Sequence, residues 1–176
     1  MRIVAGIYGG RRLIAPKNDS VRPTSDKVRG AIFNSLNSLG VIDGANVLDG
    51  FCGSGALGLE ALSRGAATCD FVEIATPAVR VIQENLDRLG GHEGAAIHRV
   101  DAGVFVQTLG PLAYDVAFAD PPYAAETVWE LVNRWLEVPF AAVFGIEHSS
   151  SLSLPAPGET RRYGSTSLTF FRADDP

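Results

Sequence analysis

Short apolar runs alternate along most of the chain with segments whose apolar residues recur at helical spacing. The runs with the length and composition of β-strands are residues 47–48, 69–72, 95–100, 116–119 and 142–146. The amphipathic helical segments between them are residues 57–64, 77–89, 104–109 and 126–136. Strands and helices that alternate in this way form a parallel sheet covered by helices on both faces. We therefore predict an α/β fold whose ligands bind beyond the carboxyl ends of the strands.

The last part of the chain departs from this alternation. Residues 160–163 and 167–171 are two strand-like runs joined by a turn at Gly164, with no helical segment between them. They predict a terminal hairpin that completes the sheet with an antiparallel strand.

The first part of the chain departs as well. Residues 2–15 contain glycines at positions 6, 9 and 10 and predict a short hairpin. After the segment Arg22-Pro23-Thr24-Ser25, apolar residues recur at helical spacing from Val28 to Leu39, and Gly40 ends the pattern. This pattern predicts a helix capped by Thr24 or Ser25.

Charge divides the chain in the same region. Up to Arg29 the chain has seven basic and two acidic residues, a net charge of +5, so the rest of the chain carries −10 of the total of −5. A concentrated basic segment attracts phosphate even on an acidic body, because salt screens charges beyond about 10 Å. A solvated surface is the simpler alternative for such a segment. We divide the chain into a basic N-terminal extension, residues 1–44, and a main domain, residues 45–176.

Length and composition exclude several classes of protein. A chain of 176 residues with 46% hydrophobic residues is long enough for one ordinary domain, and no apolar run approaches the roughly 18 residues of a membrane span. No secretory signal pattern precedes Arg11-Arg12, so we expect a cytoplasmic protein with no membrane partner. The two cysteines fit a reducing compartment, and the three histidines lack metal-ligand spacing, so we expect no metal. We also expect a monomer.

The first strand runs into a glycine-rich loop, Asp49-Gly50-Phe51-Cys52-Gly53-Ser54-Gly55-Ala56-Leu57-Gly58. Gly53, Gly55 and Gly58 match G-x-G-x-x-G, a spacing that suits both a dinucleotide and S-adenosylmethionine. Asp49 helps to separate these cofactors, because a carboxylate repels pyrophosphate but attracts the ammonium and sulfonium of S-adenosylmethionine. A tight turn without a ligand would explain the glycines but not the acid.

Two further acids stand where the second and third strands end. Glu73 lies at the distance from the loop at which an acid accepts hydrogen bonds from ribose hydroxyls, and Asp101 is placed to accept from an adenine amino group. For either acid alone, a helix N-cap is the more common role. Together with Asp49, however, three acids in register along one sheet edge indicate a cofactor site.

The strongest chemical signal follows the fourth strand, in the sequence Asp120-Pro121-Pro122-Tyr123. The two prolines lack N–H groups, which leaves the Asp120 carboxylate and the Pro121 carbonyl as acceptors without local donors. Tyr123 adds a ring on which a planar base can stack. Two acceptors would draw the hydrogens of an exocyclic amine out of the base plane and aim its lone pair at a methyl sulfonium. An ordinary exposed turn is the alternative, but it does not explain the position at a strand end level with the glycine loop.

These residues resemble the RsmD-type methyltransferases, which methylate a guanine N2 amine in 16S ribosomal RNA. The segments that carry the resemblance are residues 2–6, 10–13, 22–29, 53–61, 120–123 and 163–164. Arg22-Pro23-Thr24-Ser25 narrows the match, because the other motifs occur in many amino-methyltransferases. The resemblance implies a class I S-adenosylmethionine-dependent methyltransferase with a Rossmann-like sheet of about seven strands, the last antiparallel. It also implies an N-terminal extension that helps to hold RNA, either free 16S ribosomal RNA or a small-subunit assembly particle.

Carried over position by position, the resemblance assigns a cofactor-binding group and a catalytic group, and the positive charge of the extension adds an RNA-binding group. The cofactor-binding group is Asp49, Cys52, Gly53, Ser54, Gly55, Leu57, Glu73, Ile74, Asp101 and Ala102. The catalytic group that holds the target base is Asp120, Pro121, Pro122 and Tyr123. The RNA-binding group is Arg2, Arg11, Arg12, Lys17, Arg22, Lys27 and Arg29. The chain departs from the family pattern at Gly50, Cys52 and Ala75, so the detailed shape of the loop and of the adenine pocket stays open.

Three alternatives remain beside this hypothesis. An amino-methyltransferase acting on another RNA or DNA base, such as adenine at N6, shares the glycine loop and the Asp120 motif. A dinucleotide-dependent oxidoreductase explains the glycines and Glu73 but not Asp49 or the basic extension. A non-catalytic RNA-binding module that kept the fold is the third.

Overall fold

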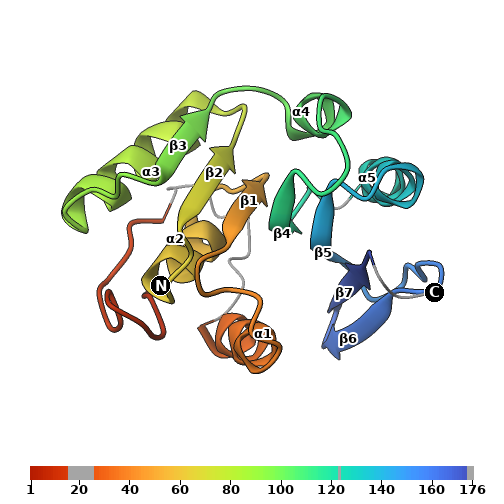
Figure 1. Cartoon of the computed structure of the whole chain (residues 1–176), viewed down its shortest axis with the longest axis horizontal. Helices are drawn as coiled ribbons and strands as arrows, with labels where there is room; N and C mark the ends of the chain where they lie inside the picture. The colour runs from red at the N-terminus through yellow and green to blue at the C-terminus, as the bar shows by residue number, and fades with distance from the viewer. Residues whose placement is uncertain (16–25, 123, 174–176) are drawn as a thin grey trace.

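The computed structural model describes residues 1–15, 26–122 and 124–173, and it describes Lys27 without its side chain (Figure 1). The elements are, in chain order, α1 (Asp26–Ser38), β1 (Asn46–Gly50), α2 (Ala56–Ser63), β2 (Thr68–Val72), α3 (Thr76–Arg88), β3 (Ala95–His98), α4 (Ala102–Gln107), β4 (Tyr114–Ala119), α5 (Ala125–Glu137), β5 (Ala141–Ser149), β6 (Glu159–Tyr163) and β7 (Thr166–Arg172). The predicted alternation of strands and helices is confirmed. So is the helix after residue 25, although its predicted caps Thr24 and Ser25 lie outside the described residues.

The strands form one seven-stranded sheet in the order β3-β2-β1-β4-β5-β7-β6. Neighbouring strands from β3 to β5 are parallel, whereas β7 runs antiparallel to both β5 and β6. The predicted terminal hairpin is therefore confirmed. Its second strand, rather than its first, inserts next to β5.

Each face of the sheet has its own hydrophobic core, as the two layers of helices in Figure 1 indicate. On one face, α1, α2 and α3 pack on side chains such as Val47, Phe71 and Phe118. On the other face, α4 and α5 pack on Leu48 and Val72, the chain neighbours of Val47 and Phe71. This alternation follows from the strand geometry, which points successive side chains to opposite faces. Within the described ranges, no helix is both long and apolar enough to cross a membrane.

Residues 1–15 fold back on themselves and pack against the first helical layer. Arg2 and Arg12 form an isolated antiparallel bridge, and Ile3 and Leu13 are buried in the same core as α1, α2 and α3. The Glu60 carboxylate on α2 accepts hydrogen bonds from the backbone N–H groups of the next two residues of this segment, Val4 at 2.7 Å and Ala5 at 3.1 Å. The described part of the N-terminal extension thus shares its core with the main domain, and the boundary at residue 45 stays a prediction.

Candidate cofactor and base sites

The carboxyl ends of the parallel strands bring the predicted acids to one edge of the sheet. Gly50 at the end of β1 pairs with Val72 of β2 and with Ala119 of β4, and Val72 pairs with His98 of β3. The residues that follow these partners therefore lie level with one another along this edge. Glu73 and Asp120 come directly after Val72 and Ala119, and Asp101 comes three residues after His98. The fourth predicted acid, Asp49, is the last residue but one of β1.

Asp49 is buried beneath the glycine loop and ties it to α2. Its Oδ2 atom accepts a hydrogen bond from the backbone N–H of Gly58 at 2.8 Å. Burial raises the pKa of Asp49 to about 8, and the nearby carboxylates of Asp120 and Glu73 act in the same direction. Proton loss at this position is therefore favoured by a cation placed above the loop.

The loop glycines are required by backbone conformation and by space. Gly53 and Gly55 have φ values of 54° and 76°, in the left-handed region that side chains disfavour. A Cβ atom at Gly58 would lie 2.4 Å from the Phe71 ring, so only glycine allows α2 to approach β2 this closely. These constraints account for the glycine spacing by packing, and they leave the loop N–H groups near the acids.

Glu73 shapes the loop from the neighbouring strand end. Its Oε2 accepts from the backbone N–H of Gly53 at 3.0 Å, and its Oε1 accepts from the backbone N–H of Ala75 at 2.8 Å. Each carboxylate oxygen keeps a second lone pair that can accept a ribose hydroxyl. Ile74, which follows, is 63% exposed and presents an apolar surface beside this carboxylate. This arrangement suits a ribose and a base edge.

Asp101 takes the helix-capping role that the sequence left open. Its Oδ1 atom accepts from the backbone N–H of Val104 at 3.0 Å and caps α4. Ala102, the first residue of that helix, is buried in the second core. A capping carboxylate still offers its other oxygen to a ligand, so its predicted cofactor role stays a prediction.

Two of the residues that depart from the family pattern, Gly50 and Cys52, fit the conformation and packing of the loop. Gly50 is paired on both sides, and Phe51 after it has a φ of 56°. Cys52 is 9% exposed, and its Sγ donates to the Val72 carbonyl at 3.4 Å. Burial raises the pKa of this thiol, which fits packing rather than nucleophilic chemistry. Leu57 is half-buried against the first core.

Asp120 differs from the other acids in its surroundings. Among the described residues, no hydrogen-bond donor contacts its carboxylate, and the Pro121 carbonyl likewise has no described donor. The two prolines that follow have no N–H group to offer. Burial raises the pKa of Asp120 to about 7, and the carboxylate of Glu147 adds to the rise. Tyr123 lies outside the described residues, so its predicted stacking role stays a prediction.

Arg29, one of the seven predicted RNA-binding residues, is buried. Its guanidinium is 0% exposed and pairs with Asp26 at 2.8 Å and with Glu60 at 3.5 Å. It also donates to the Arg2 carbonyl. The expectation that Arg29 faces RNA is therefore wrong, because this cation neutralises the buried Glu60 and fastens α1 to the N-terminal segment.

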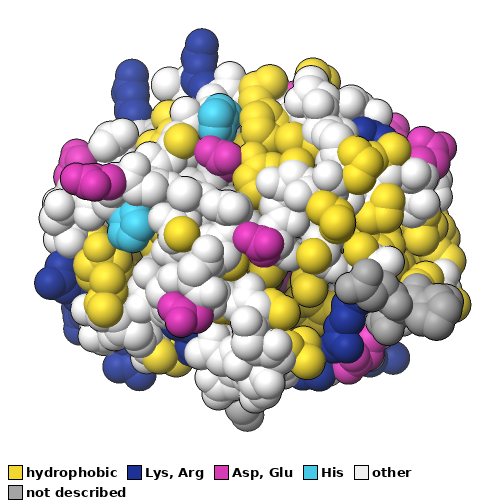
Figure 2. All heavy atoms as spheres, in the orientation of Figure 1, with side chains coloured by type: hydrophobic (Ala, Val, Ile, Leu, Met, Phe, Trp, Pro, Cys, Tyr) yellow, Lys and Arg dark blue, Asp and Glu magenta, His cyan; other side chains and the backbone are white. Residues whose placement is uncertain are grey.

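Of the other basic residues in this group, three are exposed and the side chains of the rest lie outside what the structure describes. Arg2, Arg11 and Arg12 are exposed. Arg11 lies over the Tyr8 ring at 5.5 Å and donates to the Leu89 carbonyl at 3.3 Å. Figure 2 shows that Lys and Arg side chains stand mostly around the rim of the face in view. Lys17, Arg22 and the side chain of Lys27 lie outside what the structure describes. An RNA role for all of these residues stays a prediction.

Comparison with known proteins identifies the family. The family model described as Conserved hypothetical protein 95 matches residues 1–172. YlbH of Bacillus subtilis is 35% identical over 160 residues, which cover 88% of this chain and 86% of YlbH. The Haemophilus influenzae protein named Ribosomal RNA small subunit methyltransferase D is 35% identical over 144 residues, which cover 78% of this chain and 74% of that protein. The chain belongs to this family, the RsmD family.

Solved structures confirm the fold that membership of the RsmD family implies. The Escherichia coli protein yhhF superposes with a TM-score of 0.82 at 32% identity, and the alignment covers 98% of this chain and 97% of yhhF. SMU.776, solved in complex with SAH, has a TM-score of 0.64 at 13% identity, and the alignment covers 86% of this chain and 50% of SMU.776. The predicted class I methyltransferase fold is therefore confirmed.

Two buried polar residues important to the site of this RsmD-family chain were not singled out from the sequence. Besides binding the N-terminal segment, Glu60 accepts from Arg64 Nε at 2.7 Å. Asn85 on α3 pairs with both backbone groups of Ile14 and donates to the Ser54 carbonyl at 3.1 Å, so it links the N-terminal segment to the cofactor loop. The sequence signal that could have identified both residues is a polar side chain at an apolar position of each helical pattern.

Glu147 is a third residue that was not singled out. It follows Ile146 of β5, which pairs with Ala119 just before Asp120, and it is buried. An acid at the end of the fifth strand was visible in the sequence by the rule that selected the other acids. Among the described residues, no group of three or more His, Cys, Asp or Glu side chains could hold a metal ion.

Proposed function

We propose that this protein transfers the methyl group of S-adenosylmethionine to the exocyclic N2 amine of a guanine in 16S ribosomal RNA. The observation that carries the proposal is the Asp120 carboxylate, which is half-buried and accepts no hydrogen bond from a described donor. An acceptor that is partly removed from water is costly unless a ligand supplies the missing donor. An exocyclic amine supplies two N–H groups, of which one meets Asp120 and the other meets the Pro121 carbonyl.

The cofactor half of the edge supports S-adenosylmethionine over a dinucleotide. Asp49 accepts from the backbone N–H of Gly58, and Glu73 accepts from that of Gly53. A pyrophosphate placed above this loop would meet the Glu73 carboxylate and would disfavour the ionised form of Asp49. The ammonium of S-adenosylmethionine would instead be attracted by Asp49, and its ribose hydroxyls would donate to Glu73. When bound, this cofactor supplies an activated methyl group on a sulfonium.

Asp120 and Pro121 would prepare the amine for transfer. The free amine is a weak nucleophile because its lone pair is delocalised into the ring. Hydrogen bonds to two fixed acceptors hold the N–H groups out of the ring plane, which localises the lone pair on nitrogen and directs it at the methyl carbon. The amine nitrogen would take the methyl group that the bound cofactor supplies, and the electron pair of the broken carbon–sulfur bond would stay on sulfur. The nitrogen then releases one proton, for which the ionised Asp120 carboxylate is the nearest base.

Guanine fits an aspartate at position 120 better than adenine does. Guanine presents two adjacent donors, N1–H and the N2 amine, whereas adenine places an acceptor beside its N6 amine. A carboxylate accepts from both guanine donors and offers nothing to the adenine acceptor. Methylation of adenine N6 is therefore the second candidate, and product analysis separates the two.

The named relative in the RsmD family and the exposed cations support ribosomal RNA as the substrate. The Haemophilus influenzae relative is named for the small-subunit ribosomal RNA, and Arg2, Arg11 and Arg12 are exposed to contact phosphate. We further propose that the protein acts as a monomer in the cytoplasm, where ribosomal subunits assemble.

Methyl transfer from labelled S-adenosylmethionine tests the proposal. Free 16S ribosomal RNA and small-subunit particles, both purified from cells that lack this activity, would be offered in parallel. Nucleosides from the product would then be separated by mass spectrometry. We expect N2-methylguanosine from one or both substrates. Labelled N6-methyladenosine would support the second candidate, and tight NAD binding without S-adenosylmethionine binding would support the oxidoreductase.

A further inference from the structure

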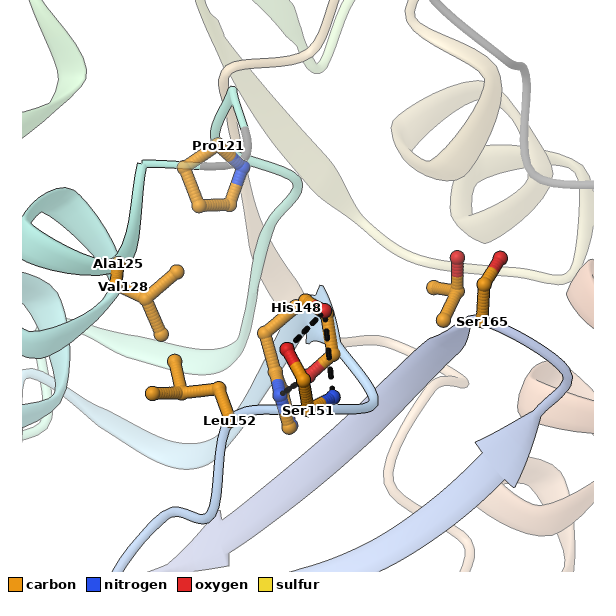
Figure 3. A pocket seen from close by; sticks show the side chains of 9 residues that line it. Pro121, Ala125, Val128, His148, Ser151, Leu152 and Ser165 are labelled. Atoms are coloured by element: carbon orange, nitrogen blue, oxygen red, sulfur yellow. Dashed lines mark hydrogen bonds between the residues drawn. The ribbon is translucent and has the colours of Figure 1, made fainter.

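A cavity of about 410 Å³ lies beside the Asp120 turn, over the ends of β5 and β7 (Figure 3). Three segments distant in sequence build it, residues 121–128, 148–152 and 165–166. The lining residues that the argument uses are Pro121, Val128, His148, Leu152, Ser165 and Thr166. Pro121 belongs both to this wall and to the turn that would hold the target amine, so the two sites adjoin.

The walls of this cavity combine apolar surface with hydroxyl groups. Figure 3 shows Pro121, Val128 and Leu152 on one side and Ser165 across from them. Among the described residues, neither the Ser165 nor the Thr166 hydroxyl has a hydrogen-bond partner. A planar group with polar edges would satisfy these hydroxyls while its faces contact the apolar side chains.

The side chains described around the cavity include no ionised group. His148 is buried, and desolvation lowers its pKa. Its Nδ1 donates to the Ser149 carbonyl at 2.9 Å, which leaves the neutral Nε2 to accept from the Thr169 hydroxyl at 2.7 Å. The described lining holds no Lys, Arg, Asp or Glu. A phosphate or an ammonium would therefore enter without a counter-charge, and the cavity favours an uncharged ligand.

We propose that this cavity binds the nucleobase adjacent to the target guanine in the RNA chain, an inference that rests on the proposed function. The target amine must lie at Asp120, which does not line the cavity. The next base along the chain is the nearest uncharged planar group. Enzymes that modify a base take it out of its stack, which leaves the adjacent base without its stacking partner. A cavity that accepts the adjacent base would hold the RNA in this opened form.

The test combines altered RNA with a variant that fills the cavity. One RNA fragment carries the guanine identified by product analysis, and two further fragments replace the nucleotide on its 5′ or 3′ side with an abasic one. Ser165→Trp fills the cavity from an exposed turn position, so little effect on folding is expected. Ser38→Trp, at the exposed end of α1, is the matched control on a different surface. Thr166→Val removes a hydroxyl while keeping its shape.

With the wild-type protein, one of the two abasic fragments should react with a kcat/KM about 5- to 150-fold lower, the range expected when a bound base is removed. Ser165→Trp should lower kcat/KM by a similar factor on the intact fragment and by little more on the sensitive abasic one. Thr166→Val should show a smaller decrease on the intact fragment only. Ser38→Trp should match the wild type. Cofactor affinity and melting temperature should be unchanged in all three variants.

Other results would overturn the inference. Equal reaction of the three fragments, or wild-type activity of Ser165→Trp on the intact fragment, would show that no neighbouring base occupies the cavity while leaving the proposed function intact. Equal decreases caused by Ser165→Trp on intact and abasic fragments would assign the cavity to another occupant, such as the target base or a ribosomal protein. Absence of methylation of any RNA by the wild-type protein would overturn the proposed function and this inference together.

Discussion

Acidic side chains stand along one edge of the sheet, but those near β1, β2 and β3 are held differently from the one after β4. Asp49, Glu73 and Asp101 each accept at least one backbone N–H of the protein itself. Asp120 accepts none from the described residues, and it faces a second acid, Glu147. The first group forms what we call the cofactor half of the edge, and Asp120 with Glu147 forms the base half.

The difference indicates how the two halves work. In the cofactor half, the acids hold the backbone of their own loops, so the binding surface is formed before any ligand arrives. In the base half, the Asp120 carboxylate has no described donor, which leaves it free to accept from the substrate. The energetic cost of this unpaired acceptor is recovered only when the reacting amine donates to it. Changes in the cofactor half should therefore weaken both binding and stability, whereas changes in the base half should lower turnover without lowering stability.

The largest expected effect is that of Asp120→Asn. Loss of one polarising acceptor should lower kcat for guanine methylation on the order of 10²–10³-fold. Stability should be equal or higher, because a neutral amide replaces a half-buried acid that has no described donor. Steady-state kinetics on ribosomal RNA and a thermal melt measure the two quantities. A wild-type rate would show that the carboxylate does not matter and would contradict the distinction between the halves.

A pH profile gives the same prediction a second readout. Because the pKa of Asp120 is raised to about 7, the carboxylate is protonated below that pH and loses acceptor capacity. The wild-type kcat should therefore rise with pH up to about 7 and then level off, while Asp120→Asn should be nearly flat over the same range. Cofactor affinity should not change in the variant.

Glu73→Ala should produce the next largest effect, on the cofactor half. Loss of a charge-assisted hydrogen bond costs about 1.5–3 kcal/mol, which is about a 10- to 150-fold weaker affinity for S-adenosylmethionine by calorimetry. The melting temperature should fall too, because the N–H groups of Gly53 and Ala75 lose their acceptor. Glu73→Gln keeps one acceptor oxygen and should lie between. The exposed Glu84→Ala on the next helix is the control, and a variant that weakens binding with no change in melting would argue against a preformed loop.

Asp49→Asn tests the cofactor half through its pH-dependent stability. An unfolded aspartic acid ionises near pH 4, whereas folded Asp49 holds its proton up to about pH 8. The folded state thus binds more protons between these values, and stability falls as pH rises through this window. Replacement by asparagine should remove up to about 1.4 kcal/mol per pH unit from that slope. Urea unfolding at several pH values measures it, and an unchanged slope would contradict the burial argument.

The smallest expected effect concerns the exposed cations outside both halves. Replacing Arg11 and Arg12 with alanine should make the slope of log RNA affinity against log salt shallower by roughly 0.7 to 0.9 for each phosphate that is no longer neutralised. Arg172→Ala is the matched control, because Arg172 ends β7, which lies beside the edge strand β6, and pairs with Glu159. If the double variant keeps both the affinity and the slope of the wild type, these residues form only a solvated surface.

The sequence alone determined the alternation of strands and helices, the terminal hairpin and the acids at successive strand ends. These features depend on local properties. Side-chain periodicity sets the element type, and a parallel sheet places the carboxyl ends of its strands at one edge whatever the packing around them. For the same reason the Asp120 carboxylate and the Pro121 carbonyl were identified as a pair of acceptors from the order of Asp120 and the two prolines in the chain.

Only the tertiary structure decided which polar residues are buried and what they contact. Arg29 has the sequence context of a surface cation, yet it lies in the core because Glu60 of another helix neutralises it. Asn85 joins segments that are far apart in the chain, and the cavity beside Pro121 is assembled from three separate segments. Burial and cavity shape depend on contacts between distant parts of the chain, which the local pattern of hydrophobic and polar residues does not encode.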